Sequence, residues 1–174
     1  MKLEVFNDFV NTTNELQQLL SSLSQQQLNQ VPFEGSWTAG QLGDHLRKSY
    51  GVAELLNGNT IKTERPVNEK ITGIKELFLN FDVKFESPDF IIPSNDVIDK
   101  DRLIKGLKNK IEQVKTFADS HDDLTRTCID IELPGAGTLT QMEWIQFMTI
   151  HTRRHIHQLK NIIANLNNEE KVVD

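Results

Sequence analysis

The chain has 174 residues, 37% of them hydrophobic and 25% charged, and its formal net charge is −6. A chain of this length can bury most of its surface around one core. We therefore expect a single domain over residues 1–174 that ends in a polar tail from about residue 167. The acidic balance lacks the electrostatic footprint of a nucleic-acid-binding protein, and the tightest basic pair is Arg153 and Arg154. We therefore expect no nucleic-acid partner.

The cysteine content and the N-terminal segment bear on the cellular compartment. Cys128 is the single cysteine, so there is no intramolecular disulfide and no CxxC pair for zinc or redox chemistry. The N-terminal segment carries acids and amides where a signal peptide has a basic start and a continuous apolar run. No stretch approaches the roughly 18 apolar residues of a membrane span. We expect a cytoplasmic protein with no membrane partner.

The first segment shows the three-to-four-residue apolar spacing of an amphipathic helix. Ser24 follows as a candidate N-cap for a short continuation through Leu28, and Pro32 ends the region. The residues expected to face inward from the first helix are Leu3, Phe6, Phe9, Val10, Thr13, Leu16, Leu20 and Leu23.

The second helix has a recognisable start and end. Thr38 can act as an N-cap by accepting hydrogen bonds from the first backbone N–H groups, and Gly58 is a suitable stop. One continuous stripe is expected to face inward between them. Its members are Leu42, His45, Leu46, Ser49, Val52, Ala53 and Leu56.

The region between residues 59 and 99 is mixed. The spacing of its apolar residues predicts a helix from Asn68 to Phe81. Pro66, Pro88 and Pro93 favour irregular, partly extended structure around that helix. Its expected inward positions are Ile71, Ile74, Leu77, Phe78 and Phe81.

A third long helix is predicted after Asp99, a candidate N-cap, and a last one from Thr138 or Leu139 to Leu166. Residues 120–138 between them are rich in turn formers and favour a small hairpin. Four long helices, with one extra short helix in the longest connection, predict an all-α four-helix bundle of the up-and-down type. The third long helix is expected to turn inward Leu103, Leu107, Ile111, Val114 and Phe117.

His151 and His155 in the last helix are four residues apart, so their imidazoles lie one turn apart on the same face. In this way one helix can offer two ring nitrogens to one cation, as the HExxH zinc helix does. The intervening residues are Thr152, Arg153 and Arg154, so the glutamate base of that metalloprotease motif is absent. Taken alone, the pair also fits two histidines that fall four apart by chance.

His45 lies on the apolar stripe of the second helix, where a partly desolvated imidazole needs partners for its ring nitrogens. Alone, it fits a hydrogen-bonded core histidine. Facing His151 and His155 across a bundle, it becomes the third ligand of a site with an open coordination position, as in catalytic zinc sites. These three histidines are the candidate ligands, and the expected cofactor is one divalent metal ion.

The other polar candidates are weaker. His157 is two residues past His155 and is expected to point away from the shared face, and His121 lies in a polar turn. Asp44 is a candidate ligand or an acceptor behind a ligand, and Gln158 is expected in the core or behind a ligand. The residues expected to serve packing are Trp37, Trp144, Met142, Met148 and the buried, inert Cys128.

Two segments carry more specific motifs. Residues 35–46 (GSWTAGQLGDHL) combine a tryptophan, a capping threonine and a histidine followed by an aliphatic residue. Residues 134–144 (PGAGTLTQMEW) and 151–158 (HTRRHIHQ) combine a glycine turn, a Glu-Trp pair and the pattern HxxRHxxQ. These segments resemble the second and last helices of the DinB-like (YfiT-like) superfamily. The matches cover both ends of the chain, and only about residues 59–99 have no sharp signature.

The resemblance implies a four-helix bundle with a metal bound by three histidines, which correspond to His45, His151 and His155. It also implies a homodimer, and a metal that is nickel, zinc, iron or manganese. The better-understood branches attach low-molecular-weight thiols to electrophiles or isomerise with a thiol cofactor, and others are described as metal-dependent hydrolases. The family name implies no DNA chemistry.

Two functions follow. The first is a metal-dependent enzyme, a thiol S-transferase or a hydrolase, in which the ion activates a thiol or a water against a small-molecule substrate. Its partners are that substrate and a low-molecular-weight thiol. The alternative is a non-catalytic bundle that binds metal or senses a ligand, since the sequence shows no positioned general base and no catalytic residue. A bundle without metal is a third interpretation, in which the histidines are satisfied by other partners.

Overall fold

The computed structural model describes residues 2–170, and the side chains of residues 2–168. The predicted polar tail from about residue 167 therefore lies mostly outside the described side chains. Within residues 2–170, each helix is too short or too polar to cross a membrane. The helices are α1 (Lys2–Ser22), α2 (Gln25–Asn29), α3 (Ala39–Ser49), α4 (Val52–Leu56), α5 (Ile71–Phe78), the 3-10 helix η1 (Asp89–Ile91), α6 (Lys100–Ser120) and α7 (Gln141–Glu170), and the strands are β1 (Thr60–Ile61) and β2 (Thr127–Cys128).

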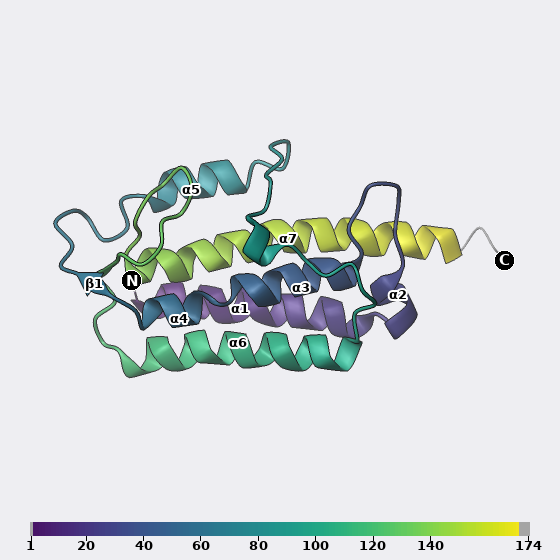
Figure 1. Ribbon diagram of the computed structural model, residues 1–174, viewed down its shortest axis with the longest axis horizontal. Coiled ribbons are helices and arrows are strands. Elements are labelled where there is room, and N and C mark those ends of the chain that lie inside the picture. Colours follow the sequence, from purple (N-terminus) through teal and green to yellow (C-terminus); the bar gives the residue numbers. More distant parts are fainter. Residues whose placement is uncertain (1, 171–174) are drawn as a thin grey trace.

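The fold is an all-α bundle, as predicted. Helices α1, α3, α6 and α7 surround one hydrophobic core, with α1 and α3 each packed against both α6 and α7 (Figure 1). The short α5 lies on the outer side of α7 (Figure 1). The longest connection, between α4 and α6, contains β1, α5 and η1. The predicted extra helix in this connection is therefore present.

The helix directions differ from a simple up-and-down bundle. Strand β1 follows α4 and pairs antiparallel with β2, which follows α6, so α3 and α6 end at the same end of the bundle. These two helices therefore run parallel, and α1 and α7 run the opposite way (Figure 1). The long connection accounts for the difference, because it carries the chain back along the whole bundle before α6 begins.

Three predicted helix starts are confirmed by their hydrogen bonds. The side chains of Ser24, Thr38 and Asp99 each accept a hydrogen bond from the backbone N–H three residues further on. At Ser24 and Thr38 the glutamine at that position also accepts from the cap residue's N–H, which forms a reciprocal capping box. Local side-chain chemistry thus fixes where α2, α3 and α6 begin.

The predicted helix from Thr38 to Gly58 is interrupted. Helix α3 ends at Ser49, and α4 begins at Val52 after Tyr50 and Gly51. The N–H of Gly51 bonds to the carbonyl of Lys48, three residues back, so the α-helical pattern tightens there. Glycine weakens helix continuity, which gives a physical reason for the break at this point.

Some positions predicted to be inward are exposed. Leu3 at the start of α1 is 70% exposed, and Leu77 and Phe81 are also on the surface. Helix α5 is shorter than predicted, since it begins at Ile71 and ends at Phe78, so Phe81 lies beyond it. Only Ile74 of α5 is fully buried, because this short helix covers α7 with a single face. The inward positions predicted for α6 are all buried.

The predicted small hairpin within residues 120–138 is present only in part. Its two ends meet at an isolated antiparallel bridge between Thr127 and Thr140, and the N–H of Cys128 donates to the carbonyl oxygen of Leu139. Strand β2 pairs with β1 from the distant connection, with Thr60 opposite Cys128. A further isolated bridge joins Leu133 to Gly137, closed by a turn in which Gly135 and Gly137 have positive φ angles. The turn signals were local, but the strand partner lies about seventy residues away in sequence.

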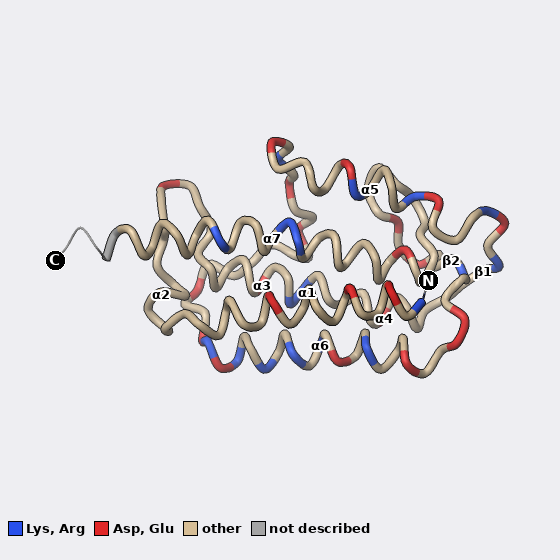
Figure 2. Tube along the Cα trace, turned by 180° about the vertical axis from the view of Figure 1, so that it is seen from behind, with Lys and Arg blue, Asp and Glu red and all other residues tan. Residues whose placement is uncertain are grey.

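Charged residues occur along the whole length of α6, where Lys and Arg predominate and a few Asp and Glu lie among them (Figure 2). They are sparse on α7, which packs against α1, α3 and α5 (Figure 2). The contrast follows from burial, since one face of α6 is solvated while α7 has neighbours on several sides. Helix α7 is therefore the central element of the bundle.

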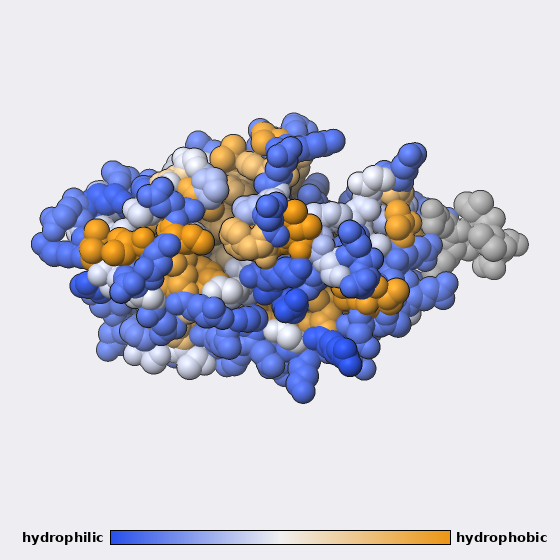
Figure 3. Space-filling view, in the orientation of Figure 1, coloured by the Kyte–Doolittle hydropathy of each residue, from blue (hydrophilic) through white to orange (hydrophobic). Residues whose placement is uncertain are grey.

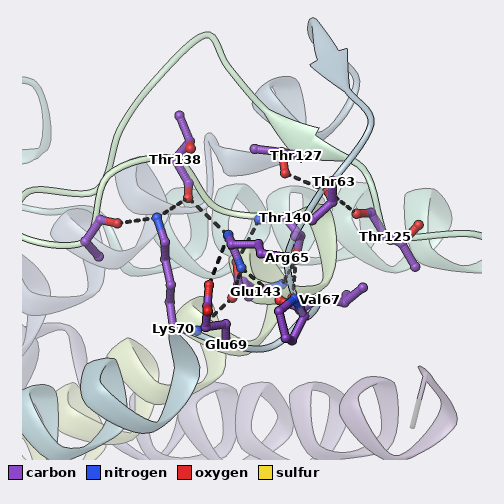
Figure 4. Close-up of polar contacts among 12 residues, drawn as sticks. Thr63, Arg65, Val67, Glu69, Lys70, Thr125, Thr127, Thr138, Thr140 and Glu143 are labelled. Atoms are coloured by element: carbon purple, nitrogen blue, oxygen red, sulfur yellow. Dashed lines mark hydrogen bonds and ion pairs between the residues drawn. The ribbon is translucent and has the colours of Figure 1, made fainter.

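A buried carboxylate anchors the start of α7. Glu143 is fully buried, and Arg65 donates to both of its oxygens at 2.9 and 2.6 Å (Figure 4). The backbone N–H groups of Lys70 and Thr140 also donate to this carboxylate, and Thr140 Oγ1 accepts from the Glu143 N–H. Burial alone would raise the pKa of Glu143, but the hydrogen bonds from Arg65, Thr140 and Lys70 hold it below its usual value of 4.5. The network joins the connection before α5 to the helix that carries two of the histidines.

Replacing Glu143 by Gln should destabilise the fold by about 2–3 kcal/mol at pH 7, because Arg65 loses its buried partner. A carboxylate with a lowered folded pKa contributes stability above about pH 4.5, and loses it as the pH falls through that folded pKa. The difference in unfolding free energy between wild type and variant should therefore shrink in acid. Urea unfolding at pH 7 and near pH 4 measures both quantities.

Glu69→Gln is the matched control, because Glu69 is half exposed and 3.7 Å from the same Arg65. This substitution should lower the free energy of unfolding by less than about 0.5 kcal/mol. Equal losses from the two variants would show that the Glu143 network does not anchor α7.

Candidate metal centre

Three histidine side chains meet where α3 packs against α7. His45 projects from α3, and His151 and His155 project from α7. The Nε2 atom of His151 lies 3.3 Å from Nε2 of His45 and 3.0 Å from Nε2 of His155. Candidate ligand atoms of the three residues all lie within 4.8 Å of one another, so together they could hold a metal ion.

The outer ring nitrogens determine where the protons lie. Nδ1 of His45 is 2.9 Å from the carbonyl oxygen of Ile91, and Nδ1 of His155 is 2.7 Å from Oε1 of Gln158. An oxygen of this kind only accepts, so both Nδ1 atoms carry the proton and both Nε2 atoms present a lone pair. The Nε2 atom of His151 can donate to at most one of them. Hydrogen bonds among the neutral rings therefore cannot satisfy all three Nε2 atoms, whereas one shared cation can.

The spacing of the nitrogens also fits an ion. Around a tetrahedral metal with bonds of about 2.0–2.1 Å to nitrogen, neighbouring ligand atoms are about 3.3 Å apart. The observed separations of 3.3 and 3.0 Å are close to that value. His151 has a buried Nδ1 without a hydrogen-bond partner, and its ring stacks on Phe147 with the planes 18° apart. Ring packing therefore orients the one ligand that lacks an outer hydrogen bond. Metal binding by the three residues stays a prediction.

Burial keeps the imidazoles neutral. His45, His151 and His155 are 2%, 8% and 6% exposed. Burial, reinforced by the two neighbouring rings, lowers the pKa of His151 well below its usual value, and burial lowers the pKa of His155 to about 3. The pKa of His45 is lowered by burial as well, although its hydrogen bond to Ile91 opposes the shift. At neutral pH all three rings are thus in the form that a metal ion requires.

A cavity of about 850 Å³ opens onto these histidines. Trp37, Trp144 and Met148 line it, and the ring centroids of Trp37 and His45 are 5.2 Å apart. The sequence predicts packing roles for these residues. The structure adds that they form part of the wall of a cavity that the three candidate ligand rings also line.

Asp44, the adjacent acidic candidate, is directed elsewhere. Arg47 and Lys48 form ion pairs with its carboxylate, and the N–H of Ser94 donates to it. Burial alone would raise the pKa of Asp44, but these hydrogen bonds hold it below its usual value. Its carboxylate is therefore occupied in fixing the segment before α6, and it is not part of the histidine cluster.

The remaining candidates have no place in the cluster. His157 is exposed, as predicted, and stacks on Phe81 with ring centroids 3.8 Å apart. His121 is exposed in its turn and stacks on Phe117. Cys128 is buried, as predicted, and burial raises the pKa of its thiol to about 11. Such a thiol is a poor nucleophile at neutral pH.

Comparison with protein families shows to which family this chain belongs. A family model described as the DinB superfamily matches residues 8–159, which include all three histidines. The chain belongs to the DinB superfamily. A relative in Bacillus subtilis (strain 168), the uncharacterized protein YuaE, is 28% identical to this DinB chain over 163 residues, 92% of this chain and 96% of the relative. No solved structure matches the chain.

Arg154 is the main residue that the sequence interpretation missed. It is 7% exposed and lies between the two histidines of α7 in sequence. Its guanidinium donates to the carbonyl oxygens of Phe78, Asn80 and Val83, and it lies over the ring of Phe85 at 4.7 Å. An arginine beside two candidate ligands was a signal. The carbonyls that it binds, however, belong to an irregular segment that local patterns do not place.

Alanine substitutions test the assignment of ligands in this DinB protein. His45→Ala, His151→Ala and His155→Ala should each abolish retention of a divalent ion through gel filtration, because two imidazoles rarely hold such an ion against buffer. His157→Ala and His121→Ala should leave the metal content nearly unchanged. Elemental analysis of protein purified without a polyhistidine tag measures the content. Equal loss of metal from His157→Ala and His155→Ala would show that the ligands have been assigned to the wrong face of α7.

Gln158→Ala should weaken metal binding about 10- to 100-fold, because the Nδ1–H of His155 then loses its acceptor and the ring its orientation. The control is Asn161→Ala, one turn further along the same cavity wall, since Asn161 makes no hydrogen bond to the rings. Competition with a metal-sensitive dye gives both affinities. Unchanged affinity in Gln158→Ala would remove Gln158 from the centre.

Proposed function

We propose that this DinB protein is a metal-dependent enzyme that activates a thiol, or a water, for reaction with a small-molecule substrate. The observation that carries the proposal is the convergence of three neutral, buried Nε2 atoms at the floor of a cavity. Three protein ligands leave an open coordination position, which is typical of catalytic rather than structural sites. A divalent ion bound there lowers the pKa of a coordinated water or thiol.

The protein residues around the cluster fix its geometry and its charge. Ile91 and Gln158 hold two of the rings through their Nδ1 atoms, and Phe147 holds the third by stacking. Because all three ligands are neutral, the full charge of the ion is available to an anionic donor. Imidazole donors suit zinc, nickel and iron. The resemblance to the DinB-like superfamily adds manganese, so the metal is proposed only within these four.

The distribution of carboxylates favours a thiol over a water. The acidic side chains that line the cavity, Glu86 and Glu132, are both exposed, and no carboxylate joins the histidine cluster among the described residues. Hydrolysis benefits from a general base beside the attacking water. A thiol held by such an ion would need none, because the ion would lower the pKa of the thiol enough for its proton to pass to bulk water. We therefore place transfer of a low-molecular-weight thiol to an electrophile ahead of hydrolysis.

The same lack of a positioned base supports a second candidate, a non-catalytic bundle that binds a metal or senses a ligand. In that case the ion and cavity would bind a small molecule without converting it. The two functions differ in turnover, and both require the histidine cluster.

Titration of a thiol into the cobalt-substituted protein tests the proposed open position. A small thiol such as 2-mercaptoethanol should produce a sulfur-to-metal charge-transfer band in the near ultraviolet, with the helical circular dichroism unchanged. The thiol should then be consumed with monochlorobimane faster than in the metal-free protein.

His155→Ala is the negative control and should give neither the band nor the acceleration. A band without thiol consumption would favour the non-catalytic function. No spectral change with several thiols and with azide would contradict an open position.

A further inference from the structure

The cavity that the histidines line has a largely apolar wall that includes several aromatic side chains. Trp37, Phe78, Trp144 and Phe147 all line it, together with Met148. The ring of Phe78 packs edge-on to both Phe147 and His151, at centroid distances of 5.2 and 6.2 Å. The apolar surface therefore continues without interruption from the wall to the candidate ligands.

The rim of the cavity is also apolar, although it faces solvent. Phe33, Leu77, Phe85, Phe90 and Ile131 line the cavity and are among the exposed large hydrophobic residues, with Phe90 70% exposed. Apolar side chains gather around η1 and extend toward the strand pair on the face shown in Figure 3. Single exposed apolar residues are common, but a set around one cavity marks a site that binds apolar surface.

Of the charged side chains that line the cavity, the two nearest the histidines in sequence, Arg154 and Lys48, are already occupied by other protein groups. Arg154 has both terminal nitrogens bound to backbone carbonyls, and Lys48 is bound to Asp44 and to the carbonyl of Ile92. The others, Lys84, Glu86 and Glu132, are exposed. A ligand rich in hydroxyl groups would leave many of them unpaired against the aromatic wall, at a cost in free energy for each.

We propose that the substrate of this site is a small molecule with an apolar body, aromatic or aliphatic, and one anionic or soft donor group that reaches the ion. The inference rests on the proposed function for the donor group, and on the cavity wall for the body. A cavity of about 850 Å³ lies in the range that encloses a ligand of drug size. The histidine rings that line it are buried, which favours a small molecule over a protein partner.

Straight-chain hydroxamic acids test this inference, because they share one metal-binding group and differ only in the apolar tail. Trp37 and Trp144 are the two tryptophans of the chain, and both line the cavity, so intrinsic fluorescence reports binding with or without metal. From acetohydroxamic to octanohydroxamic acid, the Kd for the cobalt-loaded protein should fall by up to about fourfold per methylene. That factor corresponds to about 0.8 kcal/mol per buried methylene.

Rim variants show whether the tail lies in this cavity. The double variant Phe33→Ser/Phe90→Ser should raise the Kd for octanohydroxamic acid about tenfold and leave the Kd for acetohydroxamic acid unchanged. The control is Val31→Ser/Val97→Ser, since these residues are also exposed apolar residues but do not line the cavity. It should retain the full dependence on chain length.

The outcomes separate this inference from the proposed function. A Kd that is independent of chain length would contradict the inference that the substrate has an apolar body, even if cobalt and thiols bind as proposed. Equal effects of the two double variants would overturn it as well. Failure to bind cobalt would instead contradict the proposed function. The dependence of affinity on chain length would then be measured by tryptophan fluorescence of the metal-free protein with fatty alcohols of increasing length. An affinity that does not change with length overturns the inference, and an affinity that increases with length supports it.

Discussion

Three imidazoles in contact inside an apolar bundle are costly to fold, and much of the structure serves to hold them there. Each ring loses its hydration, and two rings direct lone pairs at the same point. The favourable terms come from outside the cluster, through the Ile91 carbonyl, the Gln158 amide and the ring of Phe147. A shared cation would convert the repulsion between the nitrogens into attraction, so folding and metal binding are expected to support each other.

Helix α7 carries this arrangement along its length. Its first turn is fixed by the buried ion pair of Glu143 with Arg65, and its middle supplies two histidines and Arg154. The histidines face α3, and Arg154 faces the segment between α5 and η1. One helix therefore aligns the bundle, the candidate centre and the irregular segment between α5 and η1, and a shift of α7 along its axis would disturb all three together.

The sequence was informative wherever the controlling interaction is local. The caps at Ser24, Thr38 and Asp99 were predicted because each acts on an N–H three residues away. The pair His151 and His155 was recognisable from helical spacing, and the inward stripe of α3 pointed to His45. The DinB motifs at the two ends of the chain gave the same three residues.

The failures share a different cause. The parallel course of α3 and α6, the pairing of β1 with β2, and the exposure of Phe81 all depend on how the long connection returns across the bundle. The same holds for the acceptor of His45, which is a main-chain oxygen of Ile91 and has no side-chain signature. The interruption after Ser49 was weakly signalled by Gly51 alone. Long-range placement, rather than local propensity, limited the interpretation.

Several hydrogen bonds that join residues 78–92 to the bundle use the main-chain oxygens of that segment, while Phe78, Phe81 and Phe85 add ring contacts. Arg154, His45 and Lys48 donate to the carbonyl oxygens of residues 78, 80, 83, 91 and 92, and any amino acid can supply such an oxygen. The side chains of this segment, including Phe85 and Phe90, are therefore free to change without loss of those hydrogen bonds. Evolution can thus alter which molecules fit the cavity while the histidines stay in position, and one scaffold can acquire new specificities by substitution in a single loop.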